Sequence, residues 1–123
     1  MIYTSYFGKY RGDRGDRGVS IARWTPNWFA GESMSCFAPS QNLLKWWKTL
    51  DKKAQNSIDY QMQYYEAYTK ETLEPLVPQV HELAKQLDGK VLLCYEKPED
   101  FCHRHIVANW FCQYGYLCDE LEY

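Results

Sequence analysis

Reactive side chains crowd one short stretch of this sequence. Cys94 and Glu96 follow an apolar run, and Cys102, His103 and Arg104 come a few residues later. A thiol beside an imidazole can act as a nucleophile with its own base, and a carboxylate can orient that base or accept a proton itself. Arginine binds anions through charge-assisted hydrogen bonds. The pattern predicts a catalytic group of Cys102, His103 and Glu96, with Arg104 holding an anion.

A strand, a tight loop and a helix are expected to position these residues. Val91–Tyr95 is short and apolar, as a strand buried on both faces would be. Pro98 suits a first helical turn, and apolar residues recur at helical spacing from Phe101 onward. The unpaired amides of such a first turn would favour both an anionic ligand and a thiolate at Cys102. Neighbours on a helix point about 100° apart, however, so Cys102 and His103 could share one target only if that turn were distorted.

The remainder of the chain alternates strand and helix patterns. Expected strands are Ile2–Tyr6, Val19–Trp24 and Tyr116–Leu121, and expected helices are Gln41–Leu50 capped by Ser40, Ile58–Leu73, and a helix from Pro75 through Leu87. This order predicts an α/β fold, a small, mostly parallel sheet with helices packed on its faces in a Rossmann-like three-layer arrangement. Ligands bind such sheets at the carboxyl ends of the strands.

Three further residues are expected at that edge. Tyr6 and Cys94 end their strands and are predicted to line a pocket. Arg23, near the end of another strand, either binds an anionic ligand or forms an ion pair with Glu96. Of the adjacent Trp46 and Trp47, on the helix expected over Gln41–Leu50, one is expected to pack and the other to border a cleft or a neighbouring chain, because neighbours cannot share one helix face.

The quoted residues also resemble a known family. Leu92-Leu93-Cys94-Tyr95-Glu96, then Pro98, then Cys102-His103-Arg104, is similar to the L-L-C-x-E … P … C-H-R signature of the domain-of-unknown-function 488 family. Ile2–Tyr6 resembles that family's opening strand, and Ser20–Pro26 its second. The resemblance implies the fold and the site more than a reaction. The family's compact members resemble proteins carried on phages and other mobile elements.

Length, composition and charge narrow the classes of protein to which this chain can belong. A chain of 123 residues with 46% hydrophobic residues predicts one domain, 1–123. The net charge of −2 argues against a surface that attracts nucleic acid everywhere. Neither a leader-like start nor a membrane-length apolar run is evident, so we expect a cytoplasmic protein. The loop 8–18, with its Arg-Gly-Asp repeat, is expected to be mobile, and a phosphate cradle there is the weaker alternative.

Five cysteines without a secretory signal predict reduced thiols. No pair has the C-x-x-C spacing of a structural zinc site, and we predict neither a metal nor a cofactor. Ligation of a metal by Cys94, Cys102, His103 and His105 remains an alternative.

Three readings of the site stay open: a catalytic centre, a metal site and a structural polar cluster. The favoured hypothesis is binding or processing of a nucleotide or a nucleic-acid phosphate group. Its alternative is a non-enzymatic interaction or regulatory protein of a phage or mobile element, which would bind a protein partner. Whether the chain is an enzyme is left open by the residues alone.

Overall fold

A five-stranded parallel sheet forms the centre of the molecule. The computed structural model describes residues 1–10, 17–97 and 99–121. The strands follow the spatial order β3-β2-β4-β1-β5, and every described pairing is parallel. Their bounds are β1 Ile2–Tyr6, β2 Gly18–Ser20, β3 Glu32–Ser33, β4 Val91–Cys94 and β5 Cys118–Glu120.

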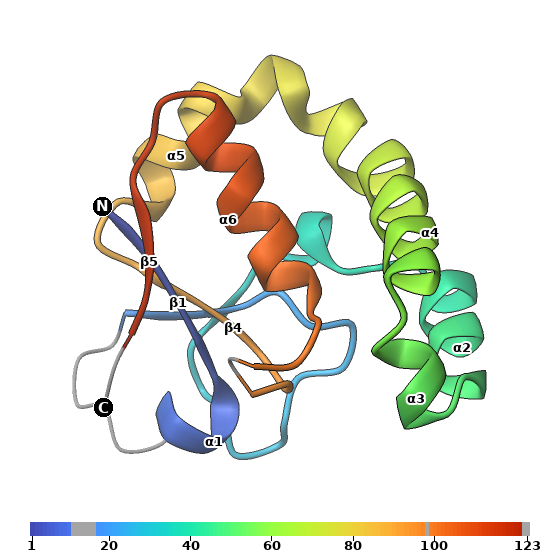
Figure 1. Cartoon of the computed structure of the whole chain (residues 1–123). Helices are drawn as coiled ribbons and strands as arrows, with labels where there is room; N and C mark the ends of the chain where they lie inside the picture. The colour runs from blue at the N-terminus through green and yellow to red at the C-terminus, as the bar shows by residue number, and fades with distance from the viewer. Residues whose placement is uncertain (11–16, 98, 122–123) are drawn as a thin grey trace.

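The helices lie in the connections between these strands. They are α1 Phe7–Tyr10, α2 Gln41–Thr49, α3 Lys52–Gln55, α4 Ile58–Tyr68, α5 Val80–Leu87 and α6 His103–Gln113. Between α4 and α5 the chain continues as a π-helical turn, Thr69–Leu73, and a 3₁₀ segment, Glu74–Gln79, and a second 3₁₀ turn spans Ser35–Phe37. Figure 1 shows this continuous run arching from α4 over to α5.

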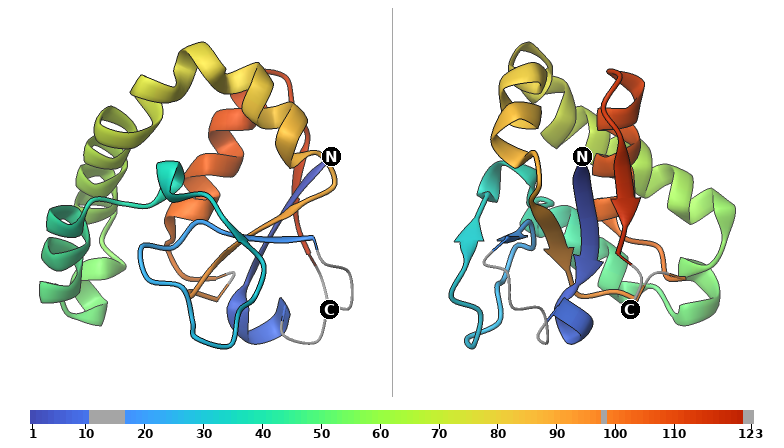
Figure 2. Two further views of the ribbon diagram at one scale, coloured as in Figure 1. Left: turned by 180° about the vertical axis from the view of Figure 1, so that it is seen from behind. Right: turned by 90° about the vertical axis from the view of Figure 1, so that its left-hand side faces the viewer.

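Two apolar clusters, one on each face of the sheet, explain the three-layer arrangement. Leu92 of β4 points into the larger cluster, which joins the sheet to α2, α4, α5 and α6. Its neighbours Val91 and Leu93 point the other way and pack with Phe7 and Tyr10 of α1. This alternation is the period of two that a strand imposes. The predicted α/β fold is confirmed, with the second outer layer reduced to α1 and nearby loops (Figure 2).

Side-chain caps mark the starts of two helices. Ser40 caps α2, because its Oγ accepts the Leu43 N–H at 3.1 Å, as predicted. Asp51 caps the short α3 in the same way, with its carboxylate 2.8 Å from the Ala54 nitrogen. That helix lies within a segment for which no helix was predicted, since its four residues, three of them polar, show no apolar periodicity.

Several predicted elements differ from the structure. The helix predicted over Ile58–Leu73 ends as α4 at Tyr68, the helix predicted from Pro75 becomes α5 only at Val80, and the final strand is shorter than Tyr116–Leu121. The second strand ends at Ser20 rather than Trp24, although the Ile21 N–H still donates to the Leu93 carbonyl at 3.1 Å. The predicted loop 8–18 begins as helix α1, while residues 11–16 lie outside the described part. The helix expected from Pro98 onward begins only at His103.

Among the described residues, no helix combines the length and apolar character needed to cross a bilayer.

Candidate functional site

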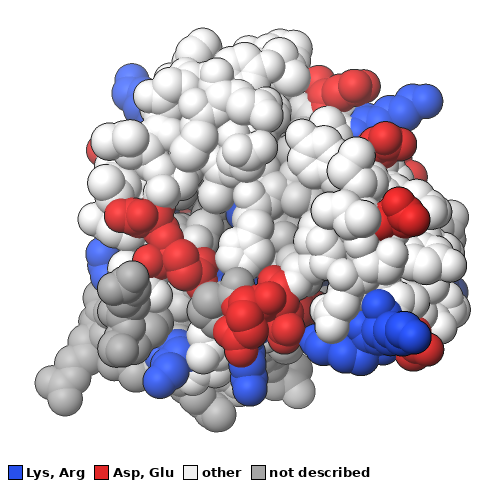
Figure 3. Space-filling model, viewed as in Figure 1, with Lys and Arg blue, Asp and Glu red and all other residues white. Residues whose placement is uncertain are grey.

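A cavity of about 350 Å³ opens at the carboxyl edge of the sheet. Parallel pairing brings the ends of β1 and β4 together there, with Tyr6 opposite Cys94. Its wall contains five aromatic residues, six polar or reactive residues and three smaller apolar ones: Trp24, Trp47, Tyr64, Tyr95 and Phe101, then Arg23, Lys48, Cys94, Glu96, Cys102 and His103, then Ala22, Pro39 and Leu44. Figure 3 shows charged side chains gathered over this lower part of the molecule.

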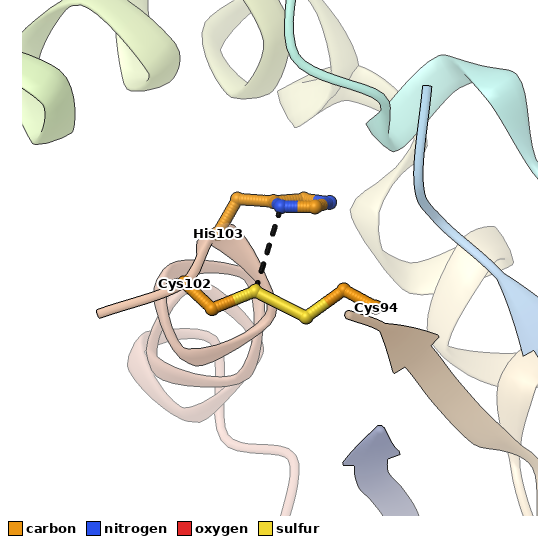
Figure 4. A group of neighbouring side chains, drawn as sticks. All are labelled: Cys94, Cys102 and His103. Carbon is orange, nitrogen blue, oxygen red and sulfur yellow. Dashed lines mark hydrogen bonds between the residues drawn. A yellow bond between two sulfur atoms is a disulfide. The ribbon is translucent and has the colours of Figure 1, made fainter. Parts of the chain in front are cut away.

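Cys94 and Cys102 are joined by a disulfide (Figure 4). Cys94 ends β4, and Cys102 lies directly before α6. The prediction of reduced thiols is therefore wrong for this pair in the form described. The number of cysteines bears on the cellular environment, and it does not report that a strand end and a helix start converge.

His103 presents a lone pair to the sulfur of Cys102. Its Nε2 lies 2.7 Å from the carbonyl oxygen of Ile21, and a carbonyl only accepts hydrogen bonds, so Nε2 carries the proton. In the neutral ring Nδ1 is then unprotonated, and it lies 3.7 Å from the Cys102 Sγ (Figure 4). Burial lowers the pKa of His103 to about 4, which keeps this ring neutral near pH 7.

The start of α6 removes the geometric difficulty anticipated from the sequence. Cys102 is the residue before the helix, with extended backbone angles of φ −153° and ψ 148°. The 100° rule for helical neighbours therefore does not apply between Cys102 and His103. Both side chains can face one point without any distortion of the first turn.

Arg104 is completely buried, and its guanidinium group donates hydrogen bonds to other groups of the protein. Its Nε and Nη2 donate to the two carboxylate oxygens of Glu120, at 3.1 and 2.8 Å. Its Nη1 donates to the Cys94 Sγ at 2.8 Å and to the Glu96 carbonyl at 2.6 Å. Arg104 was expected to hold an anion, and the carboxylate that it holds here is internal. Its side chain is not among those lining the cavity.

Glu120, the partner of Arg104, was not predicted from the sequence as a residue of the site. Burial raises the pKa of its carboxyl, but hydrogen bonds from Arg104 and Thr4 outweigh that effect and lower it. Thr4 donates to the Glu120 Oε1 at 2.5 Å, so β1 and β5 share this carboxylate. The signal available was the predicted final strand, which would bring an acidic residue beside the site.

The comparisons with known proteins support the resemblance seen in the sequence. Residues 8–115 match the family model DUF488-N3a, described as the active DUF488-N3 subclade. The chain belongs to the DUF488 family. Comparison with curated proteins and with solved structures found no match.

The remaining site residues of this DUF488 protein take distinct positions. Arg23 lines the cavity and lies over the ring of Trp24, 5.7 Å from its centroid. Among the described residues, it forms no ion pair with Glu96. Tyr6 is not among the residues lining the cavity, and its ring lies 5.9 Å from the guanidinium carbon of Arg104.

Glu96 and Lys48 bring opposite charges to the same wall of the DUF488 cavity. Burial raises the pKa of Glu96 more than its backbone hydrogen bond and the charges of Arg104 and Lys48 lower it. The carboxyl is thus more easily protonated than usual. Lys48 was not predicted as a site residue. It follows Trp47, which both packs in the core and borders the cavity, so the expected division of these two roles between Trp46 and Trp47 is wrong.

The donor set of the metal alternative also lies together in this DUF488 chain. One ligand atom from each of Cys94, Cys102 and His103 falls within 4.8 Å of the others. Within the described part of the chain, His105 is not a member of that group. Two thiolates and an imidazole suit a soft divalent metal, and they would be available as ligands only after the disulfide is reduced.

Proposed function

We propose that this protein is a cysteine-dependent enzyme that binds a nucleotide, or the phosphate-bearing end of a nucleic acid, in the cavity. The observation that carries the proposal is the placement of Cys102 and His103 in one cavity with aromatic walls and two cationic side chains. The volume of about 350 Å³ lies within the range of small-molecule sites, roughly 300–1,000 Å³. The description of the matched family model as an active subclade supports catalysis.

The aromatic wall suits a nucleobase. The rings of Trp47, Tyr64 and Phe101 pack against one another with centroids 5.2–5.3 Å apart. Such a group offers flat apolar surface, and stacking of a base on aromatic side chains contributes about 1–3 kcal/mol per base. Because every base has a π face, this contact favours nucleotides as a class and does not select among them.

Two cations would hold the phosphate. Arg23 and Lys48 both line the cavity and are exposed enough to meet a ligand from solvent. Arg104 contributes indirectly, because it holds the Cys94 sulfur and the Glu96 carbonyl in place. A guanidinium and an ammonium together form the charge-assisted contacts that phosphate oxygens accept.

Cys102, His103 and Glu96 would carry out the reaction. In the reduced protein, the Cys102 thiol can give its proton to the unprotonated Nδ1 of His103 and attack an electrophilic centre of the bound nucleotide. Glu96, whose pKa is raised, would serve as the general acid that protonates the leaving group. Cys94 borders the same pocket and has no step in this scheme.

Isothermal titration of the reduced protein tests the proposal. Inorganic phosphate, mononucleotides and short oligonucleotides are titrated separately into wild type, Arg23→Ala and Lys48→Ala. We expect a nucleotide to bind wild type and to bind each variant about tenfold or more weakly, since a charge-assisted contact contributes about 1.5–3 kcal/mol. Lys45→Ala is the matched control, because Lys45 is an exposed lysine of α2 that does not line the cavity. Equal binding by all four proteins would contradict the assignment of the site.

Exposed tryptophans support a second candidate, an interaction or regulatory protein, as in a phage or mobile element. Trp24 is 58% exposed beside the cavity and Trp28 is 40% exposed in the loop that follows. Tryptophan is enriched at the energetic centres of protein interfaces. On this reading the Arg104 cluster is purely structural. Failure of every small ligand to bind the reduced protein would favour this candidate over the enzyme.

A further inference from the structure

The proposed reaction leaves one reactive group of the cavity without a role, the sulfur of Cys94. It is bonded to the Cys102 sulfur, and the two residues are eight apart in the sequence. Tyr95, Glu96 and Phe101 lie between them and line the cavity. The bond therefore both removes the thiol of Cys102 and fixes the loop that forms one wall.

We infer that Cys94 and Cys102 exchange thiol and disulfide with low-molecular-weight thiols that enter the cavity. In this exchange the incoming thiol attacks Cys102, and Cys94 is the leaving thiolate. The exchange itself is independent of the nucleotide proposal. Its consequence rests on that proposal, because Cys102 can attack a nucleotide only in the dithiol form.

The surroundings of the two sulfurs assign the two roles. The Nη1 of Arg104 lies 2.8 Å from the Cys94 Sγ, and a neighbouring cation favours a thiolate and so a faster leaving group. The Nδ1 of His103 lies instead 3.7 Å from the Cys102 Sγ, where it can accept the proton of an incoming thiol. The base stands beside the sulfur that is attacked, and the cation stands beside the sulfur that leaves.

Access limits the partner to small molecules. Cys94 is 1% exposed and Cys102 is 3% exposed, yet both border the cavity. A protein disulfide cannot approach sulfurs buried to this degree, whereas a small thiol can enter through the opening. Arg23 and Lys48 in the lining favour an anionic thiol, for which reduced glutathione is a suitable probe.

The exchange balances with two molecules of such a thiol. The first gives its proton to His103 Nδ1, its sulfur bonds to the Cys102 sulfur, and the bond between the cysteines breaks, which leaves Cys94 as a thiolate. The protonated His103 returns this proton to the Cys94 thiolate. The second thiol then gives its proton to the free Nδ1, its sulfur attacks the sulfur of the bound thiol, and the Cys102 thiolate that is released takes that proton from His103. Two electrons and two protons pass from the small thiols to the protein, and the small disulfide departs. The reverse sequence oxidises the protein.

Trapping of the mixed disulfide tests the roles. Reduced Cys94→Ser and Cys102→Ser proteins are treated with oxidised glutathione and analysed by peptide mapping in a mass spectrometer, in the absence of any nucleotide. We expect Cys94→Ser to hold one glutathione on Cys102, because no second cysteine displaces it. Cys102→Ser should carry several-fold less on Cys94. Cys112→Ser is the control, since Cys112 is exposed and lies outside the cavity.

A measurement on wild type guards against variants that fail to fold. In buffers of increasing oxidised-to-reduced glutathione ratio, the linked Cys94–Cys102 peptide should rise from absent to complete while the fold is retained. Equal labelling of the two single variants, or preference for Cys94, would overturn the assigned roles. A pair that never changes state, or a reduced protein that retains one equivalent of zinc on these thiols, would overturn the exchange itself.

Discussion

Replacement of Glu120 by glutamine should destabilise the fold strongly, because it leaves the buried guanidinium of Arg104 without a counter-charge. The Arg104 side chain has no solvent exposure, and that of Glu120 is 24% exposed. Removing one partner of a buried ion pair costs about 3–5 kcal/mol. Water reaches Glu120 in part, and Arg104 keeps its contacts to Cys94 and Glu96, so we expect about 3 kcal/mol.

That loss is large enough to measure directly. For a chain of 123 residues it corresponds to a fall of about 10 °C in the unfolding temperature. Urea unfolding followed by circular dichroism gives the same quantity through the midpoint, provided the slope is unchanged. Asp119→Asn is the control, because it removes the same charge from an exposed neighbour in β5 and should change stability by at most about 0.5 kcal/mol.

The dependence on pH gives a second signature of the same carboxylate. The pKa of Glu120 is lowered from its ordinary value of 4.5 in the folded state, so its ionised form stabilises the fold. That contribution is complete above about pH 4.5 and is lost as the pH falls below this value through the lowered pKa. The stability difference between wild type and Glu120→Gln should therefore shrink in acid. A constant difference from pH 7 to pH 3, or a Glu120→Gln midpoint equal to that of Asp119→Asn, would refute the reasoning.

Two further changes test the local structure around the cavity, both by urea unfolding. Ser40→Ala should lower the free energy of unfolding by about 1 kcal/mol, because the Leu43 N–H loses its cap. Ser57→Ala is the control, since the Ser57 side chain makes no capping hydrogen bond to α4. An equal loss in the two variants would contradict the role of Ser40 as a cap. Tyr68→Phe should cost about 1–2 kcal/mol, because its buried hydroxyl donates to the Phe37 carbonyl at 2.6 Å; no loss would show that the bond contributes nothing.

Periodicity predicted the elements well where burial is regular. The strand Ile2–Tyr6 was placed with its observed bounds, and the helix predicted through Leu87 has its buried residues, Val80, Leu83, Ala84 and Leu87, at helical spacing. In these segments the buried residues recur with a period that is visible in the sequence. Such segments can therefore be predicted without knowing which elements they pack against. Short elements such as α3 show too few residues for any period to emerge.

The sequence predicted which part of the fold forms the site, but it did not predict the contacts between the residues of the site. The structure brings Arg23, Cys94, Glu96, Cys102 and His103 to one cavity, because parallel strands must end at a common edge. A helix boundary moved by a few residues then changed how Cys102 faces His103. Bonds such as Arg104 to Glu120 depend on side-chain reach between elements, which residue spacing does not encode.

The buried guanidinium makes fold and site interdependent. Arg104 belongs to α6, and its Nε and Nη2 bind the carboxylate of Glu120 in β5. The guanidinium group is planar and rigid, so these two contacts also fix Nη1 beside the sulfur of Cys94 at the end of β4. A planar group with two donors fixed on a carboxylate has little freedom left for its third nitrogen. Glu120 therefore positions the charge that favours a Cys94 thiolate, although it lies outside the cavity lining. Changes at this carboxylate should alter the reactivity of Cys94 as well as the stability of the sheet.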